Sequence, residues 1–194
     1  DIDKADNNGA TALMMASGEG DIASVKALIQ AGADIDKATN TGWTALMAAS
    51  QEGHAAIVEA LIQAGADLDK ANNNGVTALM MASENGHDAI AEALLQAGAD
   101  VDKAIINGGA TALIAASGEG HAAIVEALLQ AGADIDKAAN NGATALMIAS
   151  EKGHGAIVEA LIQAGADIDK AGYNGATALI AASGMGHGAI VEAL

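Results

Sequence analysis

The sequence predicts an all-α solenoid, a stack of short helix-turn-helix units, on the strength of two repeated motifs. The segment Gly-x-Thr-Ala-Leu occurs six times, with its threonine at positions 11, 44, 77, 111, 144 and 177. Successive threonines are therefore 33 residues apart, and 34 apart only between Thr77 and Thr111. The segment Gln-Ala-Gly-Ala-Asp follows the first five copies, beginning at positions 30, 63, 96, 130 and 163. A fixed period of this size is typical of solenoids, in which each unit buries its apolar face only against its neighbours.

Two short helices are expected in each repeat, as the third copy illustrates. Thr77 is suited to cap the first helix, because its hydroxyl can accept a free N–H group of the first turn. Asn85-Gly86 would end that helix. The second is expected over about 87–96, where apolar residues recur at helical spacing. Gly98 is placed to close it in a left-handed conformation.

A projecting finger is expected between one helical pair and the next. Asp67-Leu68-Asp69-Lys70 alternates in character, which favours an extended segment, and Asn74-Gly75 favours a tight turn. These features predict a β-hairpin finger. The fourth finger carries one extra residue within Ile105–Ala110 and is expected to bulge, although a single insertion is also what a tolerant loop absorbs without consequence.

The repeats predict one solenoid domain over residues 1–194. The expected boundaries are 1–32, 33–65, 66–98, 99–132, 133–165 and an incomplete 166–194. Asp21, Ser24 and Lys26 make the second helix of the first copy more polar than its equivalents, as a solenoid cap requires. The last copy keeps its apolar residues and stops before the glycine that would end its helix. We therefore expect an uncapped edge there, suited to end-to-end self-association or to a longer array.

The repeat resembles a known family along the whole chain. In the second copy the matching residues are Gly42-x-Thr44-Ala-Leu46-Met47-Ala-Ala49, Gly53-His54, Ile57-Val58, Leu61-Ile62 and Gly65-Ala66-Asp67. The pattern is similar to that of the ankyrin repeat family. The resemblance implies an ankyrin-repeat solenoid of helix-turn-helix units with fingers. It also implies a partner protein held on the concave surface that finger tips and first helices form.

Three departures from the family pattern affect these expectations. The family's proline is alanine in every copy, which keeps helix propensity. Its first-helix histidine is Met47 or an equivalent Met or Ile, which predicts apolar contacts between repeats. The aspartate that opens the pattern is replaced by residues such as Thr39, so the sequence does not predict whether the fingers are hydrogen-bonded to one another as they are in the family.

Composition and charge exclude several classes of partner. The net charge of −17 opposes binding to nucleic acid and to anionic lipid, both of which need a cationic surface. No apolar run approaches the roughly 20 residues that span a bilayer, so we expect no membrane segment. Cysteine is absent, which excludes disulfides and zinc-thiolate sites and makes the cytoplasm the default location.

No combination of residues points to catalysis, to a cofactor or to a metal. Five histidines occupy one equivalent place per repeat, at positions 54, 87, 121, 154 and 187, and helices about 8–10 Å apart keep them from sharing one ion. We expect each to tie the interhelix turn to its second helix. The Asp-x-Asp pairs, such as Asp67 and Asp69, are expected on one side of an extended segment, as solvated, turn-supporting carboxylates; weak calcium binding is the alternative. Serines such as Ser83 are expected to bond to local backbone.

Candidate partner-binding residues are those that break an otherwise constant frame. They are Trp43, Tyr173, Ile105, Ile106, Val76 and Asn140. Trp43 stands where four of six copies have alanine, and Trp and Tyr are enriched at binding hot spots. Packing of Trp43 against a neighbouring finger is the alternative. Along the first helices, Met15, Met81 and Ile148 alternate with alanine, which we interpret as core packing rather than a binding surface.

The sequence therefore predicts a non-enzymatic protein-protein interaction scaffold whose partner it does not identify. Two alternatives stay open. Near-identical units and an uncapped edge suit a structural array, either a spacer or an end-to-end filament. A chain without Arg, Phe, Pro or Cys also suits an engineered scaffold that has no native partner.

Overall fold

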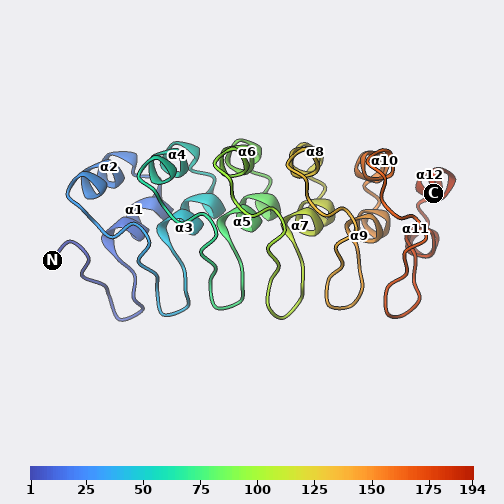
Figure 1. Ribbon diagram of the computed structural model, residues 1–194, viewed down its shortest axis with the longest axis horizontal. Helices are drawn as coiled ribbons and strands as arrows, with labels where there is room; N and C mark the ends of the chain where they lie inside the picture. Colours follow the sequence, from blue (N-terminus) through green and yellow to red (C-terminus); the bar gives the residue numbers. More distant parts are fainter. The chain divides into compact units, whose positions relative to one another are not determined.

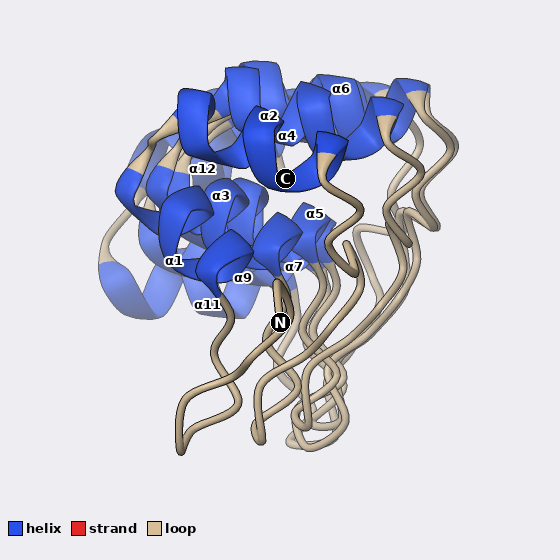
Figure 2. Ribbon diagram, turned by 90° about the vertical axis from the view of Figure 1, so that its left-hand side faces the viewer, coloured by secondary structure: helices blue, strands red, loops and turns tan.

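The computed structural model describes residues 1–194 and contains twelve short helices and no sheet (Figure 2). First and second helices of the repeats alternate along the chain. The first helices are α1 (Ala12–Glu19), α3 (Ala45–Glu52), α5 (Ala78–Asn85), α7 (Ala112–Glu119), α9 (Ala145–Lys152) and α11 (Ala178–Met185). The second helices are α2 (Ile22–Gln30), α4 (Ala55–Gln63), α6 (Asp88–Gln96), α8 (Ala122–Gln130), α10 (Gly155–Gln163) and α12 (Gly188–Ala193). The predicted all-α repeat fold is confirmed.

The chain forms two compact units, Asp1–Asp100 and Val101–Leu194. In the first unit, α1, α3 and α5 pack in one layer, and α2, α4 and α6 pack in a second layer above it (Figure 1). In the second unit, α7, α9 and α11 form one layer, and α8, α10 and α12 form the other. Within each unit the fingers project from the layer of first helices, on the side away from the second helices (Figures 1 and 2).

Every first helix begins at a threonine cap, as predicted. The Thr77 hydroxyl accepts the N–H of Met80 at 3.4 Å, and the five equivalent threonines make the same bond. The second helix of this repeat ends as expected too: Gly98 has φ +93°, and the N–H of Ala99 reaches back to the carbonyl of Leu94 at 3.0 Å. This closure satisfies carbonyls that the end of the helix would otherwise leave unpaired.

The core consists of aliphatic side chains between the two helical layers. Leu46 of α3 and Ile57 and Leu61 of α4 are at most 2% exposed, and Ala49 is completely buried. Small alanines let neighbouring first helices approach closely, while the branched side chains fill the space toward the second helices. Met47 is also buried, which confirms the expected apolar contact at the place of the family's histidine.

The expected β-hairpin fingers are not confirmed, because the fingers contain no strands. Asp67–Lys70 is a turn, in which the N–H of Lys70 donates to the carbonyl of Asp67 at 3.4 Å, and not an extended segment. The finger that follows is closed by two main-chain bonds, Asn72 N–H to Val76 O at 2.9 Å and Gly75 N–H to Asn72 O at 2.8 Å. An isolated antiparallel bridge pairs Ala104 with Thr111.

Candidate partner-binding surface

Successive fingers within each unit are joined by main-chain hydrogen bonds. In the first unit, Asn40 N–H donates to Asn8 O at 2.9 Å, and Asn73 N–H donates to Thr41 O at 3.0 Å. In the second unit the bonds are Asn140 N–H to Gly108 O at 2.8 Å and Tyr173 N–H to Asn141 O at 3.2 Å. Finger-to-finger hydrogen bonding therefore persists without the family's aspartate.

The two aspartates of each Asp-x-Asp pair have different hydrogen-bond partners, as the pair Asp67 and Asp69 illustrates. Asp67 Oδ1 accepts the N–H of Asp69 at 3.0 Å and so supports its own turn. Asp69 Oδ1 accepts the N–H of Asp100, in the next repeat, at 2.8 Å. The same link between repeats recurs at Asp3, Asp36, Asp102 and Asp136. The expectation of two carboxylates on one side of an extended segment is wrong, because the segment is a turn; the turn-supporting role is confirmed.

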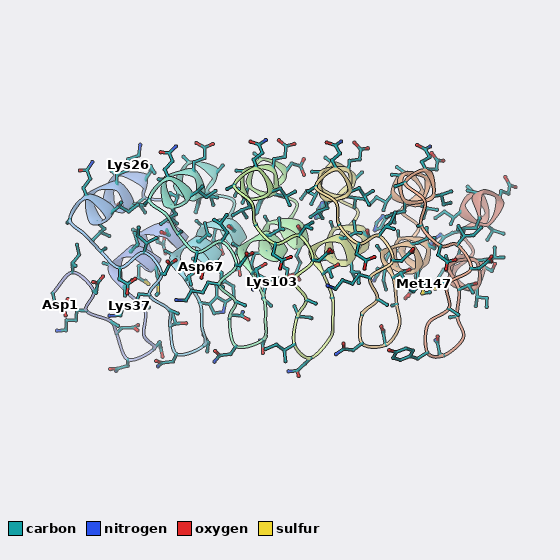
Figure 3. The ribbon with its side chains drawn as sticks, viewed as in Figure 1. Asp1, Lys26, Lys37, Asp67, Lys103 and Met147 are labelled. Atoms are coloured by element: carbon teal, nitrogen blue, oxygen red, sulfur yellow. The ribbon has the colours of Figure 1, made fainter.

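Lysine side chains reinforce these turns. Lys37 Nζ donates to the carbonyl of Asp3 at 2.8 Å, and Lys170 Nζ donates to the carbonyl of Asp136 at 2.7 Å. Figure 3 shows Lys37 and Asp67 between the helices and the finger tips, and Lys26 on the far side of α2. The carboxylates and lysines of the turns therefore hold the bases of the fingers in place.

The histidines link neighbouring repeats within each unit. His87 Nε2 lies 2.9 Å from the carbonyl oxygen of Gln51 at the end of α3, and makes no side-chain bond to the start of α6. His54, His154 and His187 make the equivalent contact at 3.0 to 3.1 Å. The expected tie to the histidine's own second helix is therefore wrong. No group of three or more His, Asp or Glu side chains gathers where it could hold a metal ion.

The serines of the first helices do not make the local bonds expected of them. The hydroxyls of Ser17, Ser50, Ser83, Ser117 and Ser150 are buried and have no hydrogen-bond partner. The tight packing of neighbouring first helices buries these groups. Nothing near them suggests an activated nucleophile.

We call the finger tips, together with the exposed faces of the first helices, the inner face of each unit. In the first unit it contains a pocket lined by Gly18, Glu19, Trp43, Ala48, Gln51 and Glu52. Trp43 is half-buried there, and its main-chain N–H donates to Thr39 Oγ1 at 3.0 Å, within its own finger. Trp43 therefore forms one wall of an open pocket.

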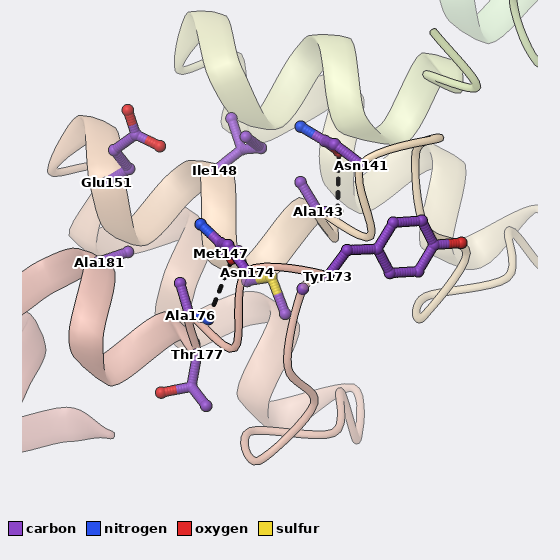
Figure 4. Close-up of a pocket in the computed structure, with 11 residues that line it drawn as sticks. Asn141, Ala143, Met147, Ile148, Glu151, Tyr173, Asn174, Ala176, Thr177 and Ala181 are labelled. Carbon is purple, nitrogen blue, oxygen red and sulfur yellow. Dashed lines mark hydrogen bonds between the residues drawn. The ribbon is translucent and has the colours of Figure 1, made fainter.

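A second pocket, of about 400 Å³, lies on the inner face of the second unit (Figure 4). Fingers five and six and helices α9 and α11 line it, with Met147 near its middle and Glu151 at the helical side. Tyr173 stands at its rim, 84% exposed, with its ring turned away from the floor. Trp43 of the first pocket is equivalent in the repeat to Ala176 of this one, so the two pockets occupy corresponding places.

The comparison with protein families gives one match that covers the whole chain. The family of ankyrin repeats matches in three copies, at residues 1–72, 65–139 and 114–194. The chain belongs to the ankyrin repeat family. Ankyrin repeats are in general protein-protein interaction modules and are typically not enzymes. A search of curated proteins gave no significant match. None of the ankyrin helices is long and apolar enough to cross a membrane.

The other residues predicted to bind a partner lie on the ankyrin fingers but are not brought together. Ile106 is 63% exposed, whereas Ile105 is half-buried and folds back over its own finger beside Gly108. Val76 is half-buried. Asn140 is exposed, but its main chain is engaged with the preceding finger. None of these residues lines either inner-face pocket.

The helical residues of the second pocket, which we call the Tyr173 pocket, were not among the residues predicted to bind a partner. Met15 is 58% exposed and Ile148 lines the pocket, although Met81 is buried in the core. The interpretation of this alternating position as core packing is therefore right for Met81 alone. Nothing in the sequence around Glu151 points to a pocket, because the residues that line the pocket with it include several from the next repeat.

Proposed function

We propose that this ankyrin repeat chain is a non-enzymatic scaffold that binds a partner protein through its inner face. The observation that carries the proposal is the pair of open pockets at corresponding places on the two units, each combining apolar surface with a carboxylate. Concave sites of this kind, with a few polar groups on an apolar lining, are typical of ligand binding. Trp43 and Tyr173 supply the large aromatic surface that binding hot spots favour.

Further support comes from the way the fingers are held. Main-chain bonds join successive fingers, so the tip side chains are presented on a fixed backbone. A surface ordered in advance loses less conformational entropy when a partner binds. The inner face therefore has both a defined geometry and side chains that are free to make contact.

Selection from a peptide library displayed on phage, followed by calorimetry, tests this function. We expect saturable binding that Trp43→Ala or Tyr173→Ala weakens by about tenfold, since truncation of a hot-spot residue costs on the order of 2 kcal/mol. Gln63→Ala, on the second helix α4, is the control and should leave affinity unchanged. Equal affinity for all four proteins would place the binding surface elsewhere, and a failure to select any ligand would contradict the function.

End-to-end self-association is a second candidate, and the exposed side of α11 favours it. Leu179 is 43% and Ile180 is 56% exposed, whereas the equivalent Leu146 and Met147 are 1% and 7% exposed. Light scattering over a range of concentrations should then show a mass that rises with concentration and that Ile180→Lys restores to that of a monomer. A monomer at every concentration would eliminate this candidate.

A further inference from the structure

The Tyr173 pocket has an apolar floor. Met147, Ala176 and Ala181 line it together with the half-buried Ile148. Met147 is 7% exposed and lies near the middle of the pocket (Figure 4). The partly exposed Ile148, Ala176 and Ala181 leave apolar surface open to water, and covering such surface with a hydrocarbon group is favourable. The floor therefore favours a ligand with an aliphatic part.

Three side-chain oxygens of the pocket already accept hydrogen bonds from main-chain N–H groups. Asn141 Oδ1 accepts the N–H of Ala143 at 3.0 Å, and Asn174 Oδ1 accepts the N–H of Ala176 at 3.1 Å, as Figure 4 shows. The Thr177 hydroxyl accepts the N–H of Ile180. These bonds hold the rim in place and leave few acceptors for a ligand.

Glu151 is the one charged residue among those that line the pocket. It lies one helical turn beyond Ile148 on α9, and its side chain is exposed at the helical side of the pocket (Figure 4). The lining contains no lysine, arginine or histidine that could pair with it. Lys152 follows Glu151 in the sequence, and the ring of His187 lies 3.0 Å from the main-chain carbonyl oxygen of Glu151, outside the lining. The lining itself therefore carries one negative charge, in a chain with a net charge of −17.

We propose that this pocket binds the arginine side chain of a basic segment in a partner protein. The inference rests on the proposed function and names the chemistry of the partner. The methylene stem lies over Met147 and Ile148, and the guanidinium group reaches the carboxylate of Glu151. Arginine fits better than lysine, because its planar, weakly hydrated head can donate two parallel hydrogen bonds to a carboxylate.

The chain supplies its own blocking substitution for a test. Ala176 corresponds to Trp43, so Ala176→Trp places in the sixth finger a residue that the second finger already accommodates. The larger side chain should occupy the apolar floor of the Tyr173 pocket. Glu151→Gln removes the charge and keeps the size of the side chain. Glu159→Gln, on the exposed side of α10, is its matched control, because it changes the net charge equally.

The experiment follows the Met147 methyl group by NMR in protein labelled at methionine methyls, with Met147→Leu for assignment. Short Gly-Ser peptides that carry one arginine, lysine or norleucine are titrated separately. We expect the arginine peptide to shift the Met147 signal and to bind most tightly. Glu151→Gln should weaken it by about fivefold, as expected for an exposed charge-assisted pair. Ala176→Trp should abolish the shift, and Glu159→Gln should change nothing.

Two results would overturn the arginine proposal. Equal binding of the norleucine peptide, or equal losses from Glu151→Gln and Glu159→Gln, would show that the carboxylate does not select the ligand. The absence of any Met147 shift at millimolar peptide would exclude the pocket. Neither result would contradict the protein-binding function, which is tested separately by selection from the peptide library. A failure of that selection would contradict the function itself.

Discussion

At the scale of single residues, the buried serines are the least expected feature of the chain. Ser17, Ser50 and Ser83 of the first unit, and Ser117 and Ser150 of the second, hold buried hydroxyls that have no hydrogen-bond partner in the protein. Ser183 has the same place in the last repeat but is exposed. A buried polar group without a hydrogen bond costs more than the same group in water. These serines therefore reduce the free energy of unfolding.

Ser83→Ala should accordingly stabilise the protein. Removing the unpaired hydroxyl should raise the free energy of unfolding by about 1 kcal/mol. Ser183→Ala, whose hydroxyl is solvated, should change it by less than about 0.5 kcal/mol. Urea unfolding followed by circular dichroism measures both. A loss of stability in Ser83→Ala would show that the hydroxyl has a favourable partner.

Asp21 is the one carboxyl whose surroundings clearly lower its pKa. It caps α2, and hydrogen bonds from the hydroxyl and then the N–H of Ser24 favour its charged form. A lowered pKa in the folded state means that the carboxylate contributes stability above its ordinary value of 3.8. That contribution is lost as the pH falls through the lowered pKa.

Ser24→Ala should therefore raise the pKa of Asp21 toward 3.8, because the largest cause of the shift is removed. NMR titration of the aspartate side-chain carbons measures the change directly. The same titration of the unsubstituted protein is the reference. An unchanged Asp21 titration in Ser24→Ala would mean that the Ser24 hydroxyl does not stabilise the ionised form of Asp21.

At the scale of the elements, the junction between the two helices of a repeat explains why a glycine ends the first helix. Gly53 ends α3 with φ +80°, and a Cβ built on it would lie 2.7 Å from Cε1 of His87. Gly65 has a similar φ of +88° but open space around its missing Cβ. Glycine at position 53 is therefore favoured both by the positive φ of the backbone and by the closeness of the His87 ring of the next repeat.

Gly53→Ala should be more destabilising than Gly65→Ala. The strain of a positive φ costs both variants about 1 kcal/mol. Gly53→Ala should reach about 2 to 3 kcal/mol, because His87 must also give up its bond to Gln51. Urea unfolding of the two variants provides the comparison. Equal losses would mean that the ring moves aside without cost.

The ends of the helices could be predicted from the sequence, because the residues that set them act on their near neighbours. The structure of the fingers and the lining of the pocket depend on contacts between residues far apart in the sequence, and these could not be predicted. Thr77 and Gly98 act within a few residues, so their spacing indicates where helices begin and end. The N–H of Asp100 is bound by Asp69, 31 residues earlier, and sequence periodicity does not show such a link. Tyr173 could be recognised from the sequence because it is the one tyrosine of the chain. Glu151 could not, because it is one of 25 acidic residues and only the structure places it in one pocket with Met147 and Ala176.

At the scale of the whole molecule, charge sets the kind of partner that approaches quickly. The chain carries 25 acidic residues against 8 lysines. A field of one sign accelerates the approach of oppositely charged proteins and slows that of similar ones. Basic partners should therefore associate fastest with this chain.

Association with a basic peptide should fall steeply as salt is added. Raising the ionic strength from about 0.01 M to about 1 M shortens the screening length from roughly 30 Å to roughly 3 Å. We expect the association rate to fall by at least about tenfold, with a smaller change in the dissociation rate. Stopped-flow fluorescence with a basic peptide from the library and an uncharged analogue measures the effect. Equal salt dependence of both peptides would contradict it.

The fingers are joined by main-chain bonds, as at Asn40 and Tyr173, and in the first unit the side-chain amides of Asn40 and Asn73 also donate to carbonyls of the preceding finger. A residue with a quite different side chain can still make the main-chain bond, as Tyr173 does at the position that is asparagine in Asn40, Asn73 and Asn140. Recognition can change by substitution at the tips without a compensating change in the helices. A chain of this kind can acquire new specificities one position at a time.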